Sequence, residues 1–158
     1  MNHPKTERSL IIIKPDALQR NLVGNIIHRF ERKGLKIIGM KMMTLEDAVL
    51  AEHYAHVADK PFYPRINRFM KSAPVIVIAI VGINAIGAIR TIVGPTKGYE
   101  ADAGSIRGDF SMSMQSNVVH ASDSVENGEI EIKRFFKEDE LFSYEKIDTT
   151  YIFSDDLL

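Results

Sequence analysis

The spacing of apolar residues along the chain predicts strands and helices that alternate in sequence. Aliphatic and β-branched runs predict strands at 9–14, 35–43, 75–81 and around 117–119. Apolar residues that recur every three or four positions predict helices at about 22–30, 49–57, 66–70, 85–93 and 125–136. Pro15 ends the first strand because its ring cannot continue the ladder, and Gly34 and Gly94 follow two of the helices as C-terminal caps.

The order of these elements leaves two sheet topologies open. Strands that alternate with helices are typical of a doubly wound parallel sheet. Two consecutive helices between the second and third strands keep an antiparallel sheet open, and periodicity alone does not decide between the two. Residues 94–116 show no clear period. An irregular segment of that length in a compact domain is more often functional than a passive connection.

Length and composition indicate one domain over 1–158, with a polar lead at 1–8 and a tail from about 145 to 158. The net charge of −1 provides no broad basic surface, so nucleic acid is not expected as the main partner. The absence of cysteine excludes disulfides, thiolate metal sites and a cysteine nucleophile, and it fits the cytoplasm, where we expect the protein. The longest apolar run, 75–81, is far shorter than the ~20 residues of a membrane span, so no membrane is expected.

The segment 117–124, NVVHASDS, is the most informative part of the sequence. Its two valines favour an extended strand, and Asp123 with Glu126 three residues later is typical of a helix N-cap with its reciprocal acid. We therefore expect His120 at a strand-to-helix turn, near a helix N-terminus that favours anions. A neutral imidazole in that place is suited to attack on a phosphoryl group. The alternative is a loop histidine that binds a backbone carbonyl.

Glu131 is a candidate partner for this histidine. It lies seven residues after Ser124, on nearly the same helical stripe. A carboxylate there could hold the imidazole in one tautomer and stabilise the cation formed on phosphorylation. The alternative is an exposed glutamate in an acidic helix.

Four residues at element ends or in the irregular segment are candidates for binding phosphate. They are Lys14, Arg90, Thr96 and Arg107. Arginine forks suit phosphate oxygens, and phosphoryl transfer depends largely on positioning and charge neutralisation. Taken singly, each cation fits a solvated surface residue better than a binding residue, and the sequence does not show that the four converge.

Phe62 and Tyr63 lie in a proline-bracketed turn between two predicted helices. Such rings can form a slot for a planar base, or they can fill the space within the helical hairpin. His53 and His56 share a helix without an evident third metal ligand, and we interpret both as structural. Residues 82–87 lack the Lys-Ser/Thr pair of a P-loop, so nucleotide chemistry would need another architecture.

Together these segments resemble the nucleoside diphosphate kinase family. The matching segments follow one another in the family's order between about residue 8 and residue 144, at 13–17 (IKPDA), 32–35 (RKGL), 61–63 (PFY), 104–110 (GSIRGDF) and 117–124. Two departures are Ala121, where the family's active-site signature commonly has glycine, and Gly98, where the long loop commonly has proline.

The resemblance implies an α+β fold, a ferredoxin-like sandwich with a four-stranded antiparallel sheet flanked by helices and a long loop at about 94–116. It also implies a ping-pong exchange of the γ-phosphate between nucleoside tri- and diphosphates, with broad tolerance of the base and Mg²⁺ bridging phosphate oxygens.

The resemblance assigns roles position by position. His120 would be phosphorylated on Nδ1, and Glu131 would hold the other ring nitrogen. Ser122 and Tyr54 would lie near the histidine, and the phosphates would be bound by Arg90, Thr96 and Arg107. Lys14 and Asn117 would contact the ribose, with Lys14 also on the γ-phosphate. Phe62 and Ile66 would lie at the base. The magnesium ion would bind through the nucleotide, with Asp123 as a candidate protein ligand through water.

The family resemblance further implies a homo-oligomer, a hexamer or a tetramer built from dimers. Gly98 in the long loop leaves the size of the assembly open, and the tail beyond Lys146 is a candidate for docking on a neighbouring subunit. Two other functions stay open as well. A nucleic-acid-binding module on the same fold would need a basic face, and a histidine phosphocarrier would need no nucleoside contacts.

Overall fold

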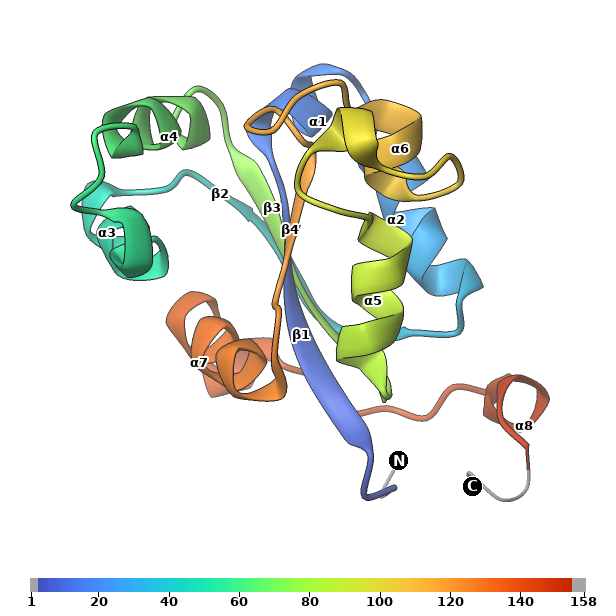
Figure 1. Cartoon of the computed structure of the whole chain (residues 1–158). Coiled ribbons are helices and arrows are strands. Elements are labelled where there is room, and N and C mark those ends of the chain that lie inside the picture. Colours follow the sequence, from blue (N-terminus) through green and yellow to red (C-terminus); the bar gives the residue numbers. More distant parts are fainter. Residues whose placement is uncertain (1–2, 155–158) are drawn as a thin grey trace.

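The strands form a single antiparallel sheet in the computed structural model, which describes residues 3–154 (Figure 1). The strands are β1 (Thr6–Ile13), β2 (Lys36–Met43), β3 (Val75–Ile83) and β4 (Val119–Ala121). Their order is β2-β3-β1-β4, and each neighbouring pair is antiparallel. The four-stranded antiparallel sheet is confirmed, and the parallel alternative is wrong. Helical connections join β1 to the parallel strand β2 and β3 to the parallel strand β4. The members of each pair are not neighbours, however, because β3 lies between β1 and β2, and β1 lies between β3 and β4.

Helices cover both faces of this sheet (Figure 1). The helices are α1 (Pro15–Gln19), α2 (Val23–Arg32), α3 (Asp47–His53), α4 (Tyr63–Met70), α5 (Ala85–Val93), α6 (Ile106–Phe110), α7 (Val125–Phe135) and α8 (Thr149–Ile152), with short 3₁₀ turns η1 (Ala55–Val57), η2 (Gly98–Glu100) and η3 (Glu138–Glu140). Between residues 3 and 154, no helix combines the length and the apolar composition that crossing a bilayer requires.

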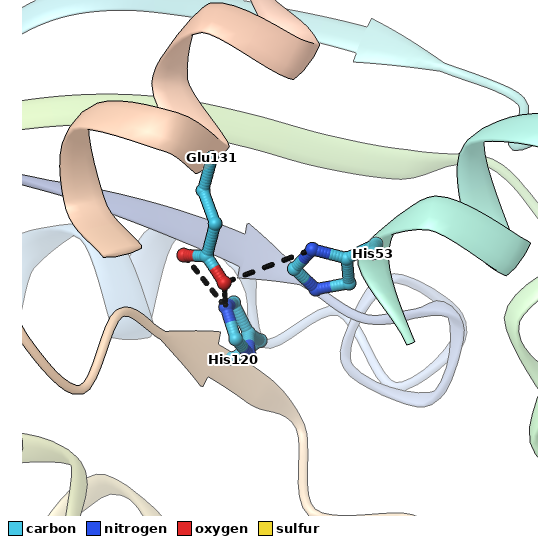
Figure 2. A group of neighbouring side chains, drawn as sticks. All are labelled: His53, His120 and Glu131. Atoms are coloured by element: carbon cyan, nitrogen blue, oxygen red, sulfur yellow. Dashed lines mark hydrogen bonds and ion pairs between the residues drawn. The ribbon is translucent and has the colours of Figure 1, made fainter. Parts of the chain in front are cut away.

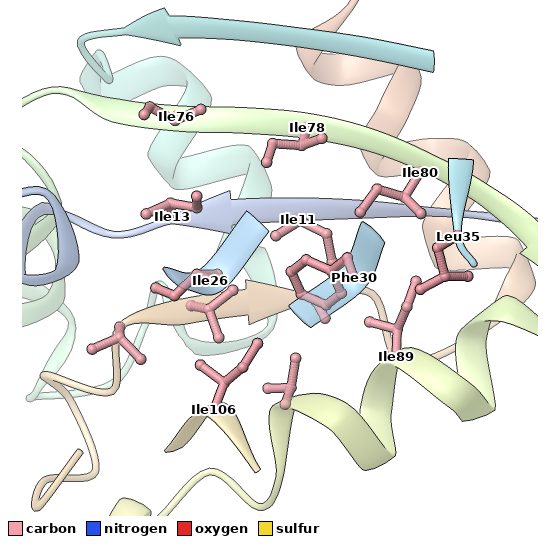
Figure 3. Close-up of a cluster of buried hydrophobic side chains, with 14 of the residues drawn as sticks. Ile11, Ile13, Ile26, Phe30, Leu35, Ile76, Ile78, Ile80, Ile89 and Ile106 are labelled. Atoms are coloured by element: carbon pink, nitrogen blue, oxygen red, sulfur yellow. The ribbon is translucent and has the colours of Figure 1, made fainter. Parts of the chain in front are cut away.

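Successive side chains of β1 and β3 point to opposite faces of the sheet and belong to two separate hydrophobic cores. Ile11 and Ile13 belong to the core beneath α2, α5 and α6, where Phe30 of α2 is fully buried (Figure 3). Leu10 and Ile12 belong to the core beneath α3, α4 and α7. This second face carries the catalytic candidates.

Several boundaries differ from the sequence prediction. β1 begins at Thr6, so the end of the polar lead 1–8 pairs with β3. The segment 94–116 contains η2 and α6, because the Ser105 side chain accepts from the amide of Gly108 and starts a short helix that periodicity is too brief to reveal. In the tail, the side chain of Ile152 in α8 lies directly over Gly34 of the same chain. The end of the tail, 155–158, lies outside the described residues.

The N-cap of the helix that follows β4 lies one residue later than predicted. Ser124 is the N-cap of α7, and its side chain accepts from the amide of Asn127. The proposed cap, Asp123, instead accepts from the Asn127 side-chain amide at 2.7 Å. Two neighbouring residues could each cap this helix, and the extended backbone of Ser124 (φ −148°) selects Ser124.

Gly128 lies within α7, where this helix crosses β1 closely. A Cβ at Gly128 would overlap the carbonyl oxygen of Arg8, whereas a Cβ at Gly87 in α5 would meet nothing within 4 Å. We predict that Gly128→Ala lowers the free energy of unfolding by about 1–3 kcal/mol through overpacking. The matched Gly87→Ala should raise it by about 0.5–1 kcal/mol, because alanine loses less backbone entropy. Urea unfolding measures both, and a Gly128→Ala protein as stable as the wild type would contradict the close approach.

Candidate functional site

The register of β4 places His120 on the sheet face that carries α3 and α7. His120 lies opposite Ile12 of β1, and Ile12 belongs to the core on that face. Residues directly opposite in an antiparallel pair point to the same side. The neighbours Val119 and Ala121 point into the other core. His120 therefore lies inside a strand, and the predicted position at a strand-to-helix turn is wrong.

The cause of this error is the backbone of Val118. Val118 has φ of 61°, a left-handed conformation that β-branched residues rarely adopt, so it does not extend β4. Both of its backbone groups are bonded to the segment that leads from β1 into α1: its amide donates to Asp16 Oδ2 at 3.1 Å, and its carbonyl accepts from the Lys14 amide at 2.9 Å. These two bonds hold the strained residue directly before the strand that carries His120.

Glu131 of α7 binds the ring of His120 at one nitrogen. Its Oε1 and Oε2 lie 3.1 and 3.2 Å from His120 Nε2 (Figure 2). An ionised carboxylate can only accept hydrogen bonds, so the proton of a neutral ring lies on Nε2. The lone pair is then on Nδ1, which is the nitrogen able to act as a nucleophile.

Glu131 is kept ionised by the groups around it. Ser122 Oγ donates to Glu131 Oε2 at 2.6 Å and accepts from the Leu10 amide at 2.9 Å. Burial raises the pKa of Glu131, but the hydrogen bonds from His120 and Ser122 and the nearby imidazoles outweigh it, and the pKa stays below its usual range. The expected pairing of Glu131 with the histidine is thus present in the structure, and the exposed alternative is wrong.

A third side chain at this carboxylate, His53, has a position that sequence reasoning missed. Its ring meets His120 edge to face, with 4.6 Å between the centroids and 79° between the planes. Its Nδ1 lies 3.7 Å from Glu131 Oε1 (Figure 2). Burial lowers the pKa of His53 to about 3, helped by His120 and opposed by Glu131, so the ring is neutral at neutral pH. The apolar face of its helix signalled burial but not the approach of α3 to β4.

Tyr54 follows His53 and lies against the same ring. The two ring centroids are 4.8 Å apart. Burial raises the pKa of Tyr54 to about 12, and the charge of Glu131 adds to this. Tyr54 is therefore an uncharged phenol over the physiological range. His56, two residues further on, is exposed, and its ring centroid lies 6.5 Å from that of Tyr54.

Predicted binding residues meet at the end of β1. Lys14 Nζ donates to Asn117 Oδ1 at 2.5 Å, and Asn117 Nδ2 donates to the backbone oxygen of Thr96 at 2.8 Å. Arg107 Nη2 donates to the backbone oxygen of Val119 at 2.6 Å, one residue before the histidine of β4. Lys14, Arg107 and Asn117 are buried, so the alternative of a solvated surface cation is wrong for Lys14 and Arg107.

The cations of this group lie close enough to disfavour one another's charge. Burial lowers the pKa of Lys14 to about 8, with a contribution from Arg107 and against the effect of Asp16. Burial, followed by the charge of Arg90, lowers the pKa of Arg107 to about 10. Cations gathered in a partly dehydrated place are suited to bind phosphate oxygens.

Phe62 immediately precedes α4, and Ile66 lies in the first turn of that helix. Phe62 is 45% exposed, whereas Ile66 packs partly against the core. The Gln115 side chain donates to the backbone oxygen of Arg65 at 3.2 Å and so ties α4 to the irregular segment. The exposed ring of Phe62 agrees with a stacking surface and not with a plug of the helical hairpin.

Two remaining positions are simple to place. Asp123 is exposed and bonded to Asn127, with no contact to His120 or to the cations among the described residues. The Ala121 methyl group is buried in the core beneath α5, on the opposite face from the His120 ring. The extra methyl group therefore does not narrow the space in front of the ring.

Comparison with known proteins identifies the family to which this chain is similar. A family model described as nucleoside diphosphate kinase matches residues 7–141. A nucleoside diphosphate kinase of Parabacteroides distasonis is 52% identical over 150 residues, which cover 95% of this chain and 98% of that relative. One of Staphylococcus haemolyticus is 50% identical over 147 residues, covering 93% and 99%.

Solved structures of the same family are similar to this chain in fold. A halophilic nucleoside diphosphate kinase from Halobacterium salinarum in complex with CDP has a TM-score of 0.90 at 36% identity, covering 93% of this chain and 98% of that one. A nucleoside diphosphate kinase family protein from Babesia bovis has a TM-score of 0.90 at 39% identity, covering 93% and 99%.

The buried charge of Lys14 has a measurable consequence for stability. Because the pKa of Lys14 falls from 10.5 to about 8 in the folded chain, the unfolded chain binds its proton more tightly between these values. The ammonium group thus destabilises the fold at neutral pH by on the order of 3 kcal/mol, and this effect fades as the pH rises from about 8 to 10.5.

We predict that Lys14→Met raises the free energy of unfolding at pH 7 and that its advantage over the wild type shrinks by pH 10. Urea unfolding at the two pH values measures this difference. Lys33→Met, at an exposed lysine, should give a small effect at both. A Lys14→Met protein less stable than the wild type at pH 7 would show that the bond to Asn117 outweighs the cost of burial.

Proposed function

Since the chain belongs to the nucleoside diphosphate kinase family, whose function is phosphotransfer between nucleotides, we propose that it transfers the γ-phosphate through a phosphohistidine on His120. The observation that carries this proposal is the bond from Glu131 to His120 Nε2, which leaves the lone pair on Nδ1. The Nδ1 lone pair attacks the γ-phosphorus, the bond to the β–γ bridging oxygen breaks, and that oxygen leaves with the nucleoside diphosphate. A second nucleoside diphosphate takes the phosphoryl group in the reverse step.

Glu131 stabilises the charge that this step creates. Phosphorylation of Nδ1 makes the imidazole cationic while Nε2 keeps its proton. The ionised carboxylate 3.1 Å from Nε2 balances that charge in a partly buried place, where electrostatic interactions are stronger than in water. Ser122 fixes the second oxygen of the carboxylate, and Tyr54 is proposed as an uncharged donor close to the transferring phosphate.

The cations at the end of β1 bind the phosphates in this proposal. Arg107, Arg90 and Thr96 contact the phosphate oxygens, and Lys14 and Asn117 contact the ribose, with Lys14 also on the γ-phosphate. One feature of the site supports these roles above all. Burial, and then the neighbouring cations, lower the pKa of Lys14 and of Arg107, and an anionic ligand would offset both effects.

The base is held only loosely in this proposal. Phe62 stacks on one face of the base, and Ile66 lies beside it. Apolar contacts of this kind do not select the hydrogen-bonding edge of a base, which supports broad tolerance among nucleosides. The exposure of the Phe62 ring is consistent with this role.

Mg²⁺ is proposed to enter with the nucleotide. The residues around the phosphate site are mainly cationic, so they fit a metal held by phosphate oxygens and not by a protein cage. When bound, Mg²⁺ neutralises and orients those oxygens. Asp123, an exposed carboxylate, is proposed as a contact through water. His53, His120 and Glu131 bring ligand atoms within 4.8 Å of one another, but Arg134 lies beside His53, which disfavours a cation there.

We further propose that residues 1–158 act as one cytoplasmic domain that assembles into a homo-oligomer, a tetramer or hexamer built from dimers. β2 is an edge strand, and Phe142 binds it by donating its amide to the Ile38 oxygen at 2.7 Å. Beyond that contact, Met40 and Met42 are 55% and 58% exposed. Met112, in the long loop, is exposed as well, and it offers a second apolar surface.

Labelling with γ-³²P-ATP and Mg²⁺ tests the phosphohistidine. We predict an acid-labile, alkali-stable phosphoprotein whose label moves to added GDP or CDP. His120→Asn should form none, and Glu131→Gln should form it at least about a hundredfold more slowly, because the carboxylate acts in the charged state. A His120→Asn protein that still labels and transfers would refute the mechanism. Label that no nucleoside diphosphate removes would indicate a phosphocarrier instead.

Light scattering tests the assembly. We predict a mass four or six times the 17.8 kDa of the chain. Met40→Lys with Met42→Lys should reduce the assembly to monomers if the β2 edge forms the dimer, whereas Met112→Lys should stop at dimers. A wild-type protein that stays monomeric at micromolar concentration would contradict the proposed oligomer.

A further inference from the structure

His53 lies in direct contact with both members of the catalytic pair. Its ring edge packs on His120 at 4.6 Å between centroids, and its Nδ1 is 3.7 Å from Glu131 Oε1. His53 extends from α3, so it reaches the pair from an element that carries neither partner. Its side chain is buried.

The position of His53 is itself fixed by several contacts. Phe135 of α7 meets its ring at 5.5 Å between centroids, and Tyr54 meets it at 4.8 Å. Arg134 Nη1 lies 3.4 Å from His53 Nδ1, and Arg134 Nε lies 2.8 Å from Glu52 Oε1. The arginine can only donate, so Nδ1 accepts and the ring proton lies on the other nitrogen. Glu52 and Arg134 together set the orientation of the ring.

We propose that His53 is a positioning residue, which holds the His120 ring against Glu131 and leaves the whole carboxylate charge to His120. A protonated ring at this place would compete with His120 for Glu131. An uncharged ring fills the space without competing. This inference rests on the proposed phosphohistidine mechanism and adds a residue that acts through His120 and Glu131 without touching the substrate.

Three variants separate this role from simple packing. His53→Ala removes the ring, and His53→Phe restores an uncharged ring of similar thickness. Leu50→Ala empties a buried site in the same helix that belongs to the same core. We expect His53→Ala to lower kcat at least about tenfold with KM nearly unchanged, because small misplacements of reacting groups are costly. His53→Phe should recover most of kcat. Leu50→Ala should lower the free energy of unfolding and leave kcat close to that of the wild type.

The outcomes distinguish this inference from the proposed function. A wild-type protein that forms no phosphohistidine overturns both. A wild type that labels on His120, with a folded His53→Ala protein of unchanged kcat, overturns the role of His53 alone. If His53→Ala and Leu50→Ala lower kcat equally, or if His53→Phe stays as slow as His53→Ala, ring packing against His120 is not the cause and the inference fails.

Discussion

The hydrogen bond between Glu131 and His120 is the interaction on which the site depends. It ties the middle of α7 to β4, and through Ser122 it also reaches the amide of Leu10 in β1. The central strand of the sheet therefore sets the position of the carboxylate, and the carboxylate sets which ring nitrogen carries the proton. Without this acceptor the imidazole would be free to rotate or to place its proton on Nδ1, and the nucleophile would be lost.

The cations at the end of β1 show a second constraint, in which binding opposes stability. Lys14 and Arg107 are buried, and their carbonyl and amide partners satisfy hydrogen bonds without supplying a full negative charge. Both cations are bonded to residues 117–119, the segment that leads into His120. A fold that holds such a group must obtain its stability elsewhere, and here it does so from the two cores on either face of the sheet.

Much of the fold and the site could be predicted from sequence, for identifiable reasons. β1 and β3 are predictable because each is a dense apolar run, and Glu131 is predictable because helical periodicity fixes its stripe. The strand order could not be predicted from periodicity, since strands that follow each other in sequence are not neighbours in the first and last pairs, β1 with β2 and β3 with β4. The left-handed backbone of Val118 depends on Asp16 and Lys14, which are remote in sequence. The sequence predicts only a structural role for His53, because nothing local reveals which ring a buried histidine contacts.

The central claim is that a neutral His120 carries its proton on Nε2 and donates it to Glu131. ¹⁵N NMR of the free protein, labelled at the histidine ring nitrogens and assigned with His120→Asn, reads this tautomer directly. The account predicts a protonated Nε2 and an unprotonated Nδ1 for His120 at neutral pH. A His120 signal from the opposite tautomer, with the proton on Nδ1, would contradict it.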